Sequence, residues 1–149
     1  MAYTKSATVR SPILGLLGGT RVVGKLRDAA ALEARVKKGL PFQALEQLMD
    51  AAHLSRDQAV KLFALPARTF VRRKRAGTLT FEETDRVVQF AELFALATQV
   101  LGKSDNAARW LQASNPYLGD IAPVERLDNA LGRRAVQELL NRIAYGMLA

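Results

Sequence analysis

The sequence predicts an all-α fold, and three observations carry this prediction. Apolar residues recur at intervals of three and four along most of the chain, which is the spacing of one face of a helix. Residues typical of helix caps stand at both ends of these periodic segments. No segment alternates apolar and polar residues as a half-buried strand would. We therefore expect helices joined by short turns.

Residues 1–40 are expected to form an N-terminal segment that is partly irregular and contains one helix. That helix starts after Asp28, a favourable N-cap residue, and ends at Gly39, where a left-handed cap is common. The run ILGLLGGTRVVGK before it is rich in glycine and follows no clear pattern. Pro41 then opens the next helix, because proline is well tolerated at a helix start.

A helix-turn-helix followed by a long helix is expected over residues 41–102. Ser55 begins a capping box, Ser-Arg-Asp-Gln, and Pro66 forces a short turn before the next helix, which ends at Gly77. Thr80 and Glu83 form a second capping box, from which a long helix extends to about residue 101. The second half of this helix is apolar on nearly every side, so it must be buried all round. A core helix and a helix shared with a partner subunit fit this pattern equally well.

A third unit is expected over residues 103–149, with helices at 104–114, 122–131 and 133–145. Asn115 and Pro116 end the first of these, and Gly132 separates the last two. Trp110 is expected to pack in the core, because it can bury a large apolar area.

Positive charge is concentrated in one part of the chain. The net charge is +8, and no acidic residue stands between Gln58 and Phe81, where six basic ones occur: Lys61, Arg68, Arg72, Arg73, Lys74 and Arg75. On a helical wheel, Ala67, Phe70 and Val71 form one side, which should pack on the preceding helix, and Arg68, Thr69, Arg72 and Arg73 form the other. This separation favours a recognition helix over a merely solvated charged face.

The predicted DNA-binding residues are Arg68, Thr69, Arg72, Arg73, Lys74 and Arg75. Thr69, Arg72 and Arg73 are the candidates for base contacts, because arginine pairs with guanine and threonine can touch a thymine methyl group. Lys74 and Arg75 lie off that face and are expected to contact phosphates. A membrane surface is a weaker alternative, because an interfacial helix needs a broad apolar face.

Several classes of protein are disfavoured by composition. The chain has no cysteine, so thiolate metal sites are excluded, and His53 is its only histidine, so that a His-based triad has one possible base and most hydrolase and metalloenzyme mechanisms are disfavoured. The segment GTRVVGK lacks the hydroxyl residue that a phosphate-binding loop needs after its lysine. We expect no catalytic residues, metal site, cofactor or small-molecule substrate. No apolar run approaches the about 20 residues of a membrane span, which predicts a cytoplasmic protein without a membrane partner.

The C-terminal third resembles the Xre/MbcA/ParS toxin-binding domain of bacterial antitoxins. The matching residues are Ala107, Trp110, Leu111, Asn115, Pro116, Leu118, Gly119, Pro123, Leu127, Gly132, Val136, Leu139, Ile143, Tyr145 and Gly146. The resemblance continues upstream into the Xre-type helix-turn-helix, through Arg68, Thr69, Arg72, Arg73, Lys74, Gly77, Leu79, Glu83 and Arg86. The chain departs from the family at Asp120, where a second glycine is frequent, and at Val124, where leucine is.

This resemblance implies an antitoxin from a two-gene type II toxin–antitoxin module. Such a protein is not an enzyme; it forms a homodimer, neutralises a toxin that typically carries an NAD-degrading RES domain, and represses its own operon. The alternative is a stand-alone helix-turn-helix transcriptional regulator without a toxin partner.

The chain ends on NRIAYGMLA, and this apolar ending is a candidate toxin contact. Gly146 can turn the chain out of the last helix in a left-handed cap, and Tyr145 lies opposite the core stripe. A competing explanation is that Met147 continues that stripe. With the resemblance, the predicted toxin-binding residues are Asn115, Pro116, Tyr145, Gly146, Met147, Leu148 and Ala149, and the tip is expected to block the NAD pocket.

Overall fold

The computed structural model describes residues 12–147, and every regular element in that part of the chain is a helix. The all-α prediction is therefore confirmed. The α-helices are α1 (Pro12–Leu16), α2 (Thr20–Val23), α3 (Ala29–Lys38), α4 (Phe42–Ala52), α5 (Arg56–Leu62), α6 (Ala67–Ala76), α7 (Phe81–Leu101), α8 (Ser104–Gln112) and α9 (Ala130–Ala144). Two 3₁₀ helices, η1 (Pro116–Leu118) and η2 (Pro123–Arg126), lie between α8 and α9.

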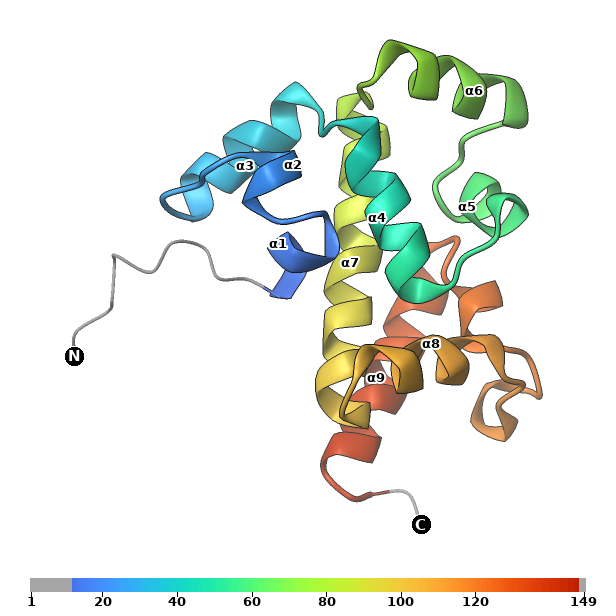
Figure 1. Cartoon of the computed structure of the whole chain (residues 1–149). Coiled ribbons are helices and arrows are strands. Elements are labelled where there is room, and N and C mark those ends of the chain that lie inside the picture. The colour runs from blue at the N-terminus through green and yellow to red at the C-terminus, as the bar shows by residue number, and fades with distance from the viewer. Residues whose placement is uncertain (1–11, 148–149) are drawn as a thin grey trace, which may run out of the picture.

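Helix α7 is the central element of the fold (Figure 1). It packs against α1 and α3 on one side and against α4, α8 and α9 elsewhere. This arrangement explains why its second half is apolar on nearly every side: Phe90, Phe94 and Ala97 are all buried. The predicted polar strip is visible at Glu92 and Gln99, which are exposed. Helix α7 is thus a core helix within one chain.

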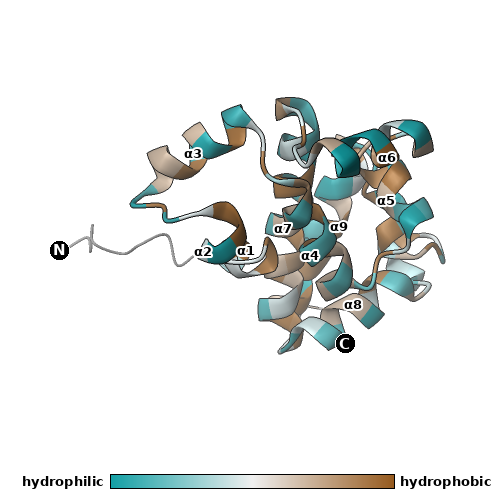
Figure 2. Ribbon diagram, turned by 45° about the horizontal axis from the view of Figure 1, so that its top comes forward, coloured by the Kyte–Doolittle hydropathy of each residue, from teal (hydrophilic) through white to brown (hydrophobic). Residues whose placement is uncertain are grey.

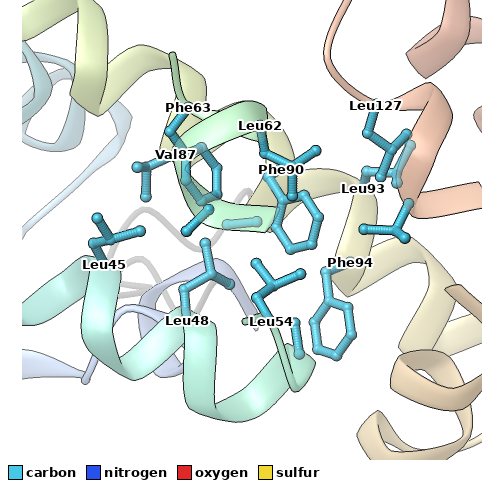
Figure 3. Close-up of a cluster of buried hydrophobic side chains, with 14 of the residues drawn as sticks. Leu45, Leu48, Leu54, Leu62, Phe63, Val87, Phe90, Leu93, Phe94 and Leu127 are labelled. Carbon is cyan, nitrogen blue, oxygen red and sulfur yellow. The ribbon is translucent and has the colours of Figure 1, made fainter. Parts of the chain in front are cut away.

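The core joins the helix-turn-helix region to the C-terminal helices without a break. Figure 3 shows aromatic side chains of α7 beside leucines of α4 and a phenylalanine that follows α5. The ring of Phe90 lies 5.8 Å from Phe63 in an edge-to-face arrangement and stacks at 6.2 Å on Phe94. Leu127 reaches the same cluster from the C-terminal region. These contacts fix the position of α5 relative to α7.

Three of the predicted helix starts, those of α3, α5 and α7, are confirmed in detail. Both capping boxes form: the N–H of Gln58 donates to Ser55 Oγ at 3.1 Å, and that of Glu83 donates to Thr80 Oγ1 at 3.2 Å. In α3 the side chain of Asp28 accepts from the N–H of Ala31 at 2.9 Å. Local residue choice therefore determines where these helices begin.

The N-terminal segment is more regular than predicted. Besides α3 it contains the short helices α1 and α2, which bury Leu14, Leu17 and Val23 against the rest of the core. Gly18 and Gly19 have φ angles of 101° and 69°, which lets the chain turn sharply between these helices. The glycines that obscured the sequence pattern are the ones that make the turn.

Two predictions about residues 122–133 are wrong. The predicted helix at 122–131 is reduced to η2, and α9 begins at Ala130. Gly132 does not separate two helices; it is buried inside the first turn of α9, where the side chain of Asn129 accepts from its N–H at 2.9 Å. A Cβ atom at Gly132 would overlap the carbonyl oxygen of Arg126. The glycine is required because η2 passes directly against α9.

Candidate functional site

Helices α5 and α6 form a helix-turn-helix. Residues 63–66 connect them, and Ala64 adopts a left-handed conformation with φ 50° at the turn. In Figure 2 hydrophilic colours dominate α6, and Phe70 is its one buried residue. The ring of Phe70 meets Phe42 of α4 edge-to-face at 5.1 Å. The guanidinium carbon of Arg56, at the start of α5, lies 4.7 Å from the centre of the Phe70 ring.

Backbone contacts fix the C-terminal end of α6. Gly77 caps the helix in a left-handed conformation, and its carbonyl accepts from the N–H of Phe42 at 2.9 Å. The N–H of Leu79 donates to the carbonyl of Leu40 at 2.9 Å. The chain before α4 is thus tied to the chain after α6, so that the C-terminal end of α6 is held in place although the helix buries only one side chain.

The structure brings most of the predicted DNA-binding residues onto one exposed surface. Arg68, Arg72 and Arg75 are exposed, and Thr69 is half-buried in the first turn of α6. Lys74 is exposed and lies 3.4 Å from the carboxylate of Glu46 on α4. Because this last pair is open to water, it contributes little to stability and leaves the ammonium group accessible.

Arg73 is not where the helical wheel placed it. Its Nε donates to Glu83 Oε1 at 2.8 Å, and its side chain is 22% exposed. The same carboxylate oxygen accepts from the N–H of Thr80 at 2.9 Å. The prediction that Arg73 stands on the free face beside Arg72 is wrong, because its guanidinium joins α6 to the capping box of α7.

The carboxylate of Glu83 is stabilised in its charged form. Burial raises its pKa, but the hydrogen bonds and the positive charge of Arg73, together with the hydrogen bonds from Thr80, outweigh burial and leave the pKa below its ordinary value. The ion pair of Glu83 and Arg73 therefore positions the recognition helix.

Val71 is a second residue that departs from the helical-wheel prediction. Instead of packing on α5, this residue is 43% exposed.

The C-terminal end of α9 turns outward, as the sequence predicts. Gly146 has a φ of 67°, its N–H donates to the carbonyl of Ile143, and the N–H of Met147 donates to that of Arg142. These two bonds are those of a Schellman cap. Tyr145 is 80% and Met147 68% exposed, so the alternative that Met147 continues the core stripe is wrong. Leu148 and Ala149 lie outside the described residues.

Asn115 and Pro116 have different roles in the loop after α8. Asn115 is buried, its side chain accepts from the N–H of Tyr117 at 3.0 Å, and its own N–H donates to the carbonyl of Ile121 at 3.2 Å. Pro116 is exposed. Asn115 thus shapes the loop, and Asp120, where glycine is frequent in the resembled family, has a left-handed φ of 61°.

Sequence reasoning missed the two side chains that this loop displays. Tyr117 and Ile121 are both exposed although they are large and apolar. Bulky apolar residues inside a turn rich in Asn, Pro, Gly and Asp were the available signal, because such turns lie on the surface. They place a second apolar feature in the C-terminal region of the chain.

Two further properties concern residues 12–147 only. They contain no group of three or more His, Cys, Asp or Glu side chains that could hold a metal ion. No helix among them has the length and hydropathy needed to cross a membrane.

Comparison with known proteins gives two family matches and several relatives. Residues 31–92 match the antitoxin Xre-like helix-turn-helix domain, and residues 96–146 match the antitoxin Xre/MbcA/ParS C-terminal toxin-binding domain. An antitoxin Xre from Pseudomonas putida is 30% identical over 127 residues, which cover 83% of this chain and 77% of the relative. An antitoxin Xre from Photorhabdus laumondii is 25% identical over 120 residues, or 79% of this chain and 81% of the relative.

A third relative is the Prs ADP-ribosylating antitoxin of a Sphingobium species, 28% identical over 126 residues, which cover 76% of this chain and 78% of the relative. The matches extend over both the helix-turn-helix and the C-terminal helices, in the order in which the structure presents them. The chain therefore belongs to the Xre family of antitoxins, non-enzymatic proteins of toxin–antitoxin systems that combine a helix-turn-helix with a toxin-binding domain.

Proposed function

We propose that this antitoxin represses its own operon through α6 and neutralises an NAD-degrading RES-domain toxin through its C-terminal end. The observation that carries the proposal is the placement of two chemically different surfaces. Exposed arginines cover α6, whereas Tyr145 and Met147 project from the end of α9. These elements lie at opposite ends of the molecule (Figure 1), so that operator DNA and toxin could be bound at the same time.

The DNA contacts divide into two groups. Arg68 and Arg72, exposed on the N-terminal half and middle of α6, are assigned to base edges, because the N-terminal part of a recognition helix reaches deepest into the major groove. Lys74 and Arg75 are assigned to phosphates, as is Thr69, which is half-buried. Arg73 is assigned a positioning role through Glu83.

The protein is proposed to act as a homodimer. Two recognition helices related by a two-fold axis would meet half-sites about 34–36 Å apart, which predicts an inverted repeat in the operator. A gel-shift titration of the DNA upstream of the antitoxin gene, against a scrambled duplex of equal length, tests repression at its own promoter. Equal affinity for both duplexes would reject it.

The toxin contact is proposed to centre on Tyr145, Gly146 and Met147, continued by Leu148 and Ala149. The Schellman cap turns the chain out of α9 and leaves Tyr145 and Met147 exposed, and the loop that Asn115 shapes adds the exposed residues Pro116, Tyr117 and Ile121. An apolar tip of this kind can enter a concave pocket that binds a nucleotide. The name of the Sphingobium relative points to a setting of ADP-ribosyl chemistry, which draws on NAD.

Co-expression with the product of the adjacent gene tests the toxin assignment. The adjacent gene alone should arrest growth and deplete cellular NAD, and the antitoxin should restore both and co-purify with its product. Growth arrest without loss of NAD would be compatible with an antitoxin function but would contradict the proposal that the toxin carries an NAD-degrading RES domain. Both activities place the protein in the cytoplasm, where the operator and NAD are found.

A further inference from the structure

Val71 lies on the surface that α6 turns away from the protein, next to Arg68 and Arg75. At 100° per residue, Arg68 and Arg75 lie within about 60° of Val71, whereas Arg73 lies on the opposite side. The structure agrees with this geometry, since Arg73 is tied to Glu83 and Val71 is 43% exposed. A strongly basic surface therefore includes an exposed apolar, β-branched side chain.

When this surface binds DNA, the group that suits the exposed Val71 side chain is apolar and lies among the phosphates and base edges that the arginines contact. Val71 has no polar atom with which to bind a phosphate or a base heteroatom. An apolar protein surface is a poor partner, because it would have to desolvate the guanidinium groups of Arg68 and Arg75 as well. In the major groove of DNA one group meets the requirement, the C5-methyl group of thymine.

We propose that Val71 reads thymine in the operator by packing on its C5-methyl group. The inference rests on the proposed DNA binding by α6 and adds a specificity residue to it. Arg75 contacts a phosphate and Arg68 a base edge beside the contact, and Val71 covers the methyl group on the floor of the groove. The same contact would accept 5-methylcytosine, which carries a methyl group at the same ring position.

The size of the effect follows from the area involved. Burying one methyl group changes an equilibrium constant about fourfold, and two half-sites in a dimer give about 15-fold. Val71 is exposed in the free protein, so that replacing it with alanine should not alter the fold. Unchanged thermal unfolding of Val71→Ala checks this point.

The test compares two forms of the same DNA. The fragment upstream of the antitoxin gene is amplified with dTTP or with dUTP, which removes every C5-methyl group and leaves all hydrogen-bonding groups in place. Dissociation constants are measured at one salt concentration for the wild type, for Val71→Ala and for Leu131→Ala. Leu131 is an exposed apolar residue on α9 and serves as the matched control.

The wild type and Leu131→Ala should bind the uracil fragment about 15-fold more weakly than the thymine fragment. Val71→Ala should bind the thymine fragment more weakly and lose little further affinity on the uracil fragment. Single thymine-to-uracil changes should then identify one sensitive position in each half-site. Equal losses on uracil DNA for the wild type and Val71→Ala, or no loss for the wild type, would overturn the proposal. If the wild type does not prefer this fragment to a scrambled duplex, the proposed repression fails as well.

Discussion

The DNA-binding end and the C-terminal end of this antitoxin are held in place by different forces. Helix α6 buries one side chain, Phe70, and is otherwise fixed by its Gly77 cap, by the backbone bond from Phe42 to Gly77 and by the Arg73–Glu83 pair. Helix α9 buries four residues: Gly132, Val136, Leu139 and Leu140. A recognition helix has to leave most of its surface free for DNA. Each of the few contacts that hold α6 therefore contributes a larger share of its stability than a single contact of α9 does. The proposed toxin contact begins only at Tyr145, after the last residue of α9, so that α9 can keep one face buried in the core.

The largest effect is expected from a variant that removes the single apolar anchor of α6. Phe70→Ala deletes a buried ring that packs on Phe42 and Arg56, and we expect a loss of about 3–5 kcal/mol in the free energy of unfolding. Operator affinity should fall sharply, and binding of toxin by the folded fraction should persist. Urea unfolding and gel shifts measure these effects. Phe81→Ala is the control, because Phe81 is exposed and should cost less than about 0.5 kcal/mol.

The matching change at the other end is Gly132→Ala. The added methyl group collides with the carbonyl of Arg126, so that η2 and α9 must separate, at a cost of about 1–3 kcal/mol. Pull-down of toxin should weaken more than operator binding. Gly15→Ala is the control, because a Cβ atom there meets nothing within 4 Å. An equal loss of stability in Gly132→Ala and Gly15→Ala would show that the close approach of Arg126 is not the reason for a glycine at position 132.

Two neighbouring arginines of α6 are expected to have different roles, one in DNA binding and one in stability. Arg72→Ala removes an exposed side chain and should reduce discrimination between operator sequences by about 1–3 kcal/mol without loss of stability. Arg73→Ala leaves the carboxylate of Glu83 buried without its partner and should cost about 1.5–3 kcal/mol of stability. Binding to operator variants and thermal melting separate the two effects. A stable Arg73→Ala protein with altered base preference would restore Arg73 as a base contact.

The smallest expected effect is a dependence of the free energy of unfolding on pH. The pKa of Glu83 is lower in the folded protein than in the unfolded chain, so the unfolded state binds more protons below the ordinary glutamate pKa of about 4.3. The stabilisation from the pair is complete above this pH and is lost as the pH falls through the folded pKa. Unfolding free energies at several pH values should show Glu83→Gln approaching the wild type in acid. A difference that stays constant with pH would contradict this assignment.

Features that depend on neighbouring residues could be predicted from the sequence. Both capping boxes and the outward turn at Gly146 follow from residue types that act within one helical turn, and all three form as expected. The basic surface of α6 was also recognisable, because charge is visible in the sequence.

Features that depend on distant contacts could not be predicted. A helical wheel correctly places Phe70 against the molecule but does not fix how far the buried face extends to either side of it, so that Val71 is exposed and Arg73 is held against Glu83, contrary to prediction. Gly132 looked like a helix break because the close approach of Arg126 is not visible in the local sequence. Short 3₁₀ helices such as η2 have the same residue composition as the start of an α-helix, and packing against other elements determines which of the two forms.

The central claim is that DNA and toxin are bound by separate surfaces of one chain. The most direct measurement compares Arg72→Ala with deletion of residues 147–149, in parallel titrations of operator DNA and growth-rescue assays against the toxin. We predict that Arg72→Ala loses about 1–3 kcal/mol of operator affinity and rescues growth, whereas the truncated protein binds the operator like the wild type and rescues growth poorly. Full rescue by the truncated protein, or loss of both activities in either variant, would contradict the claim.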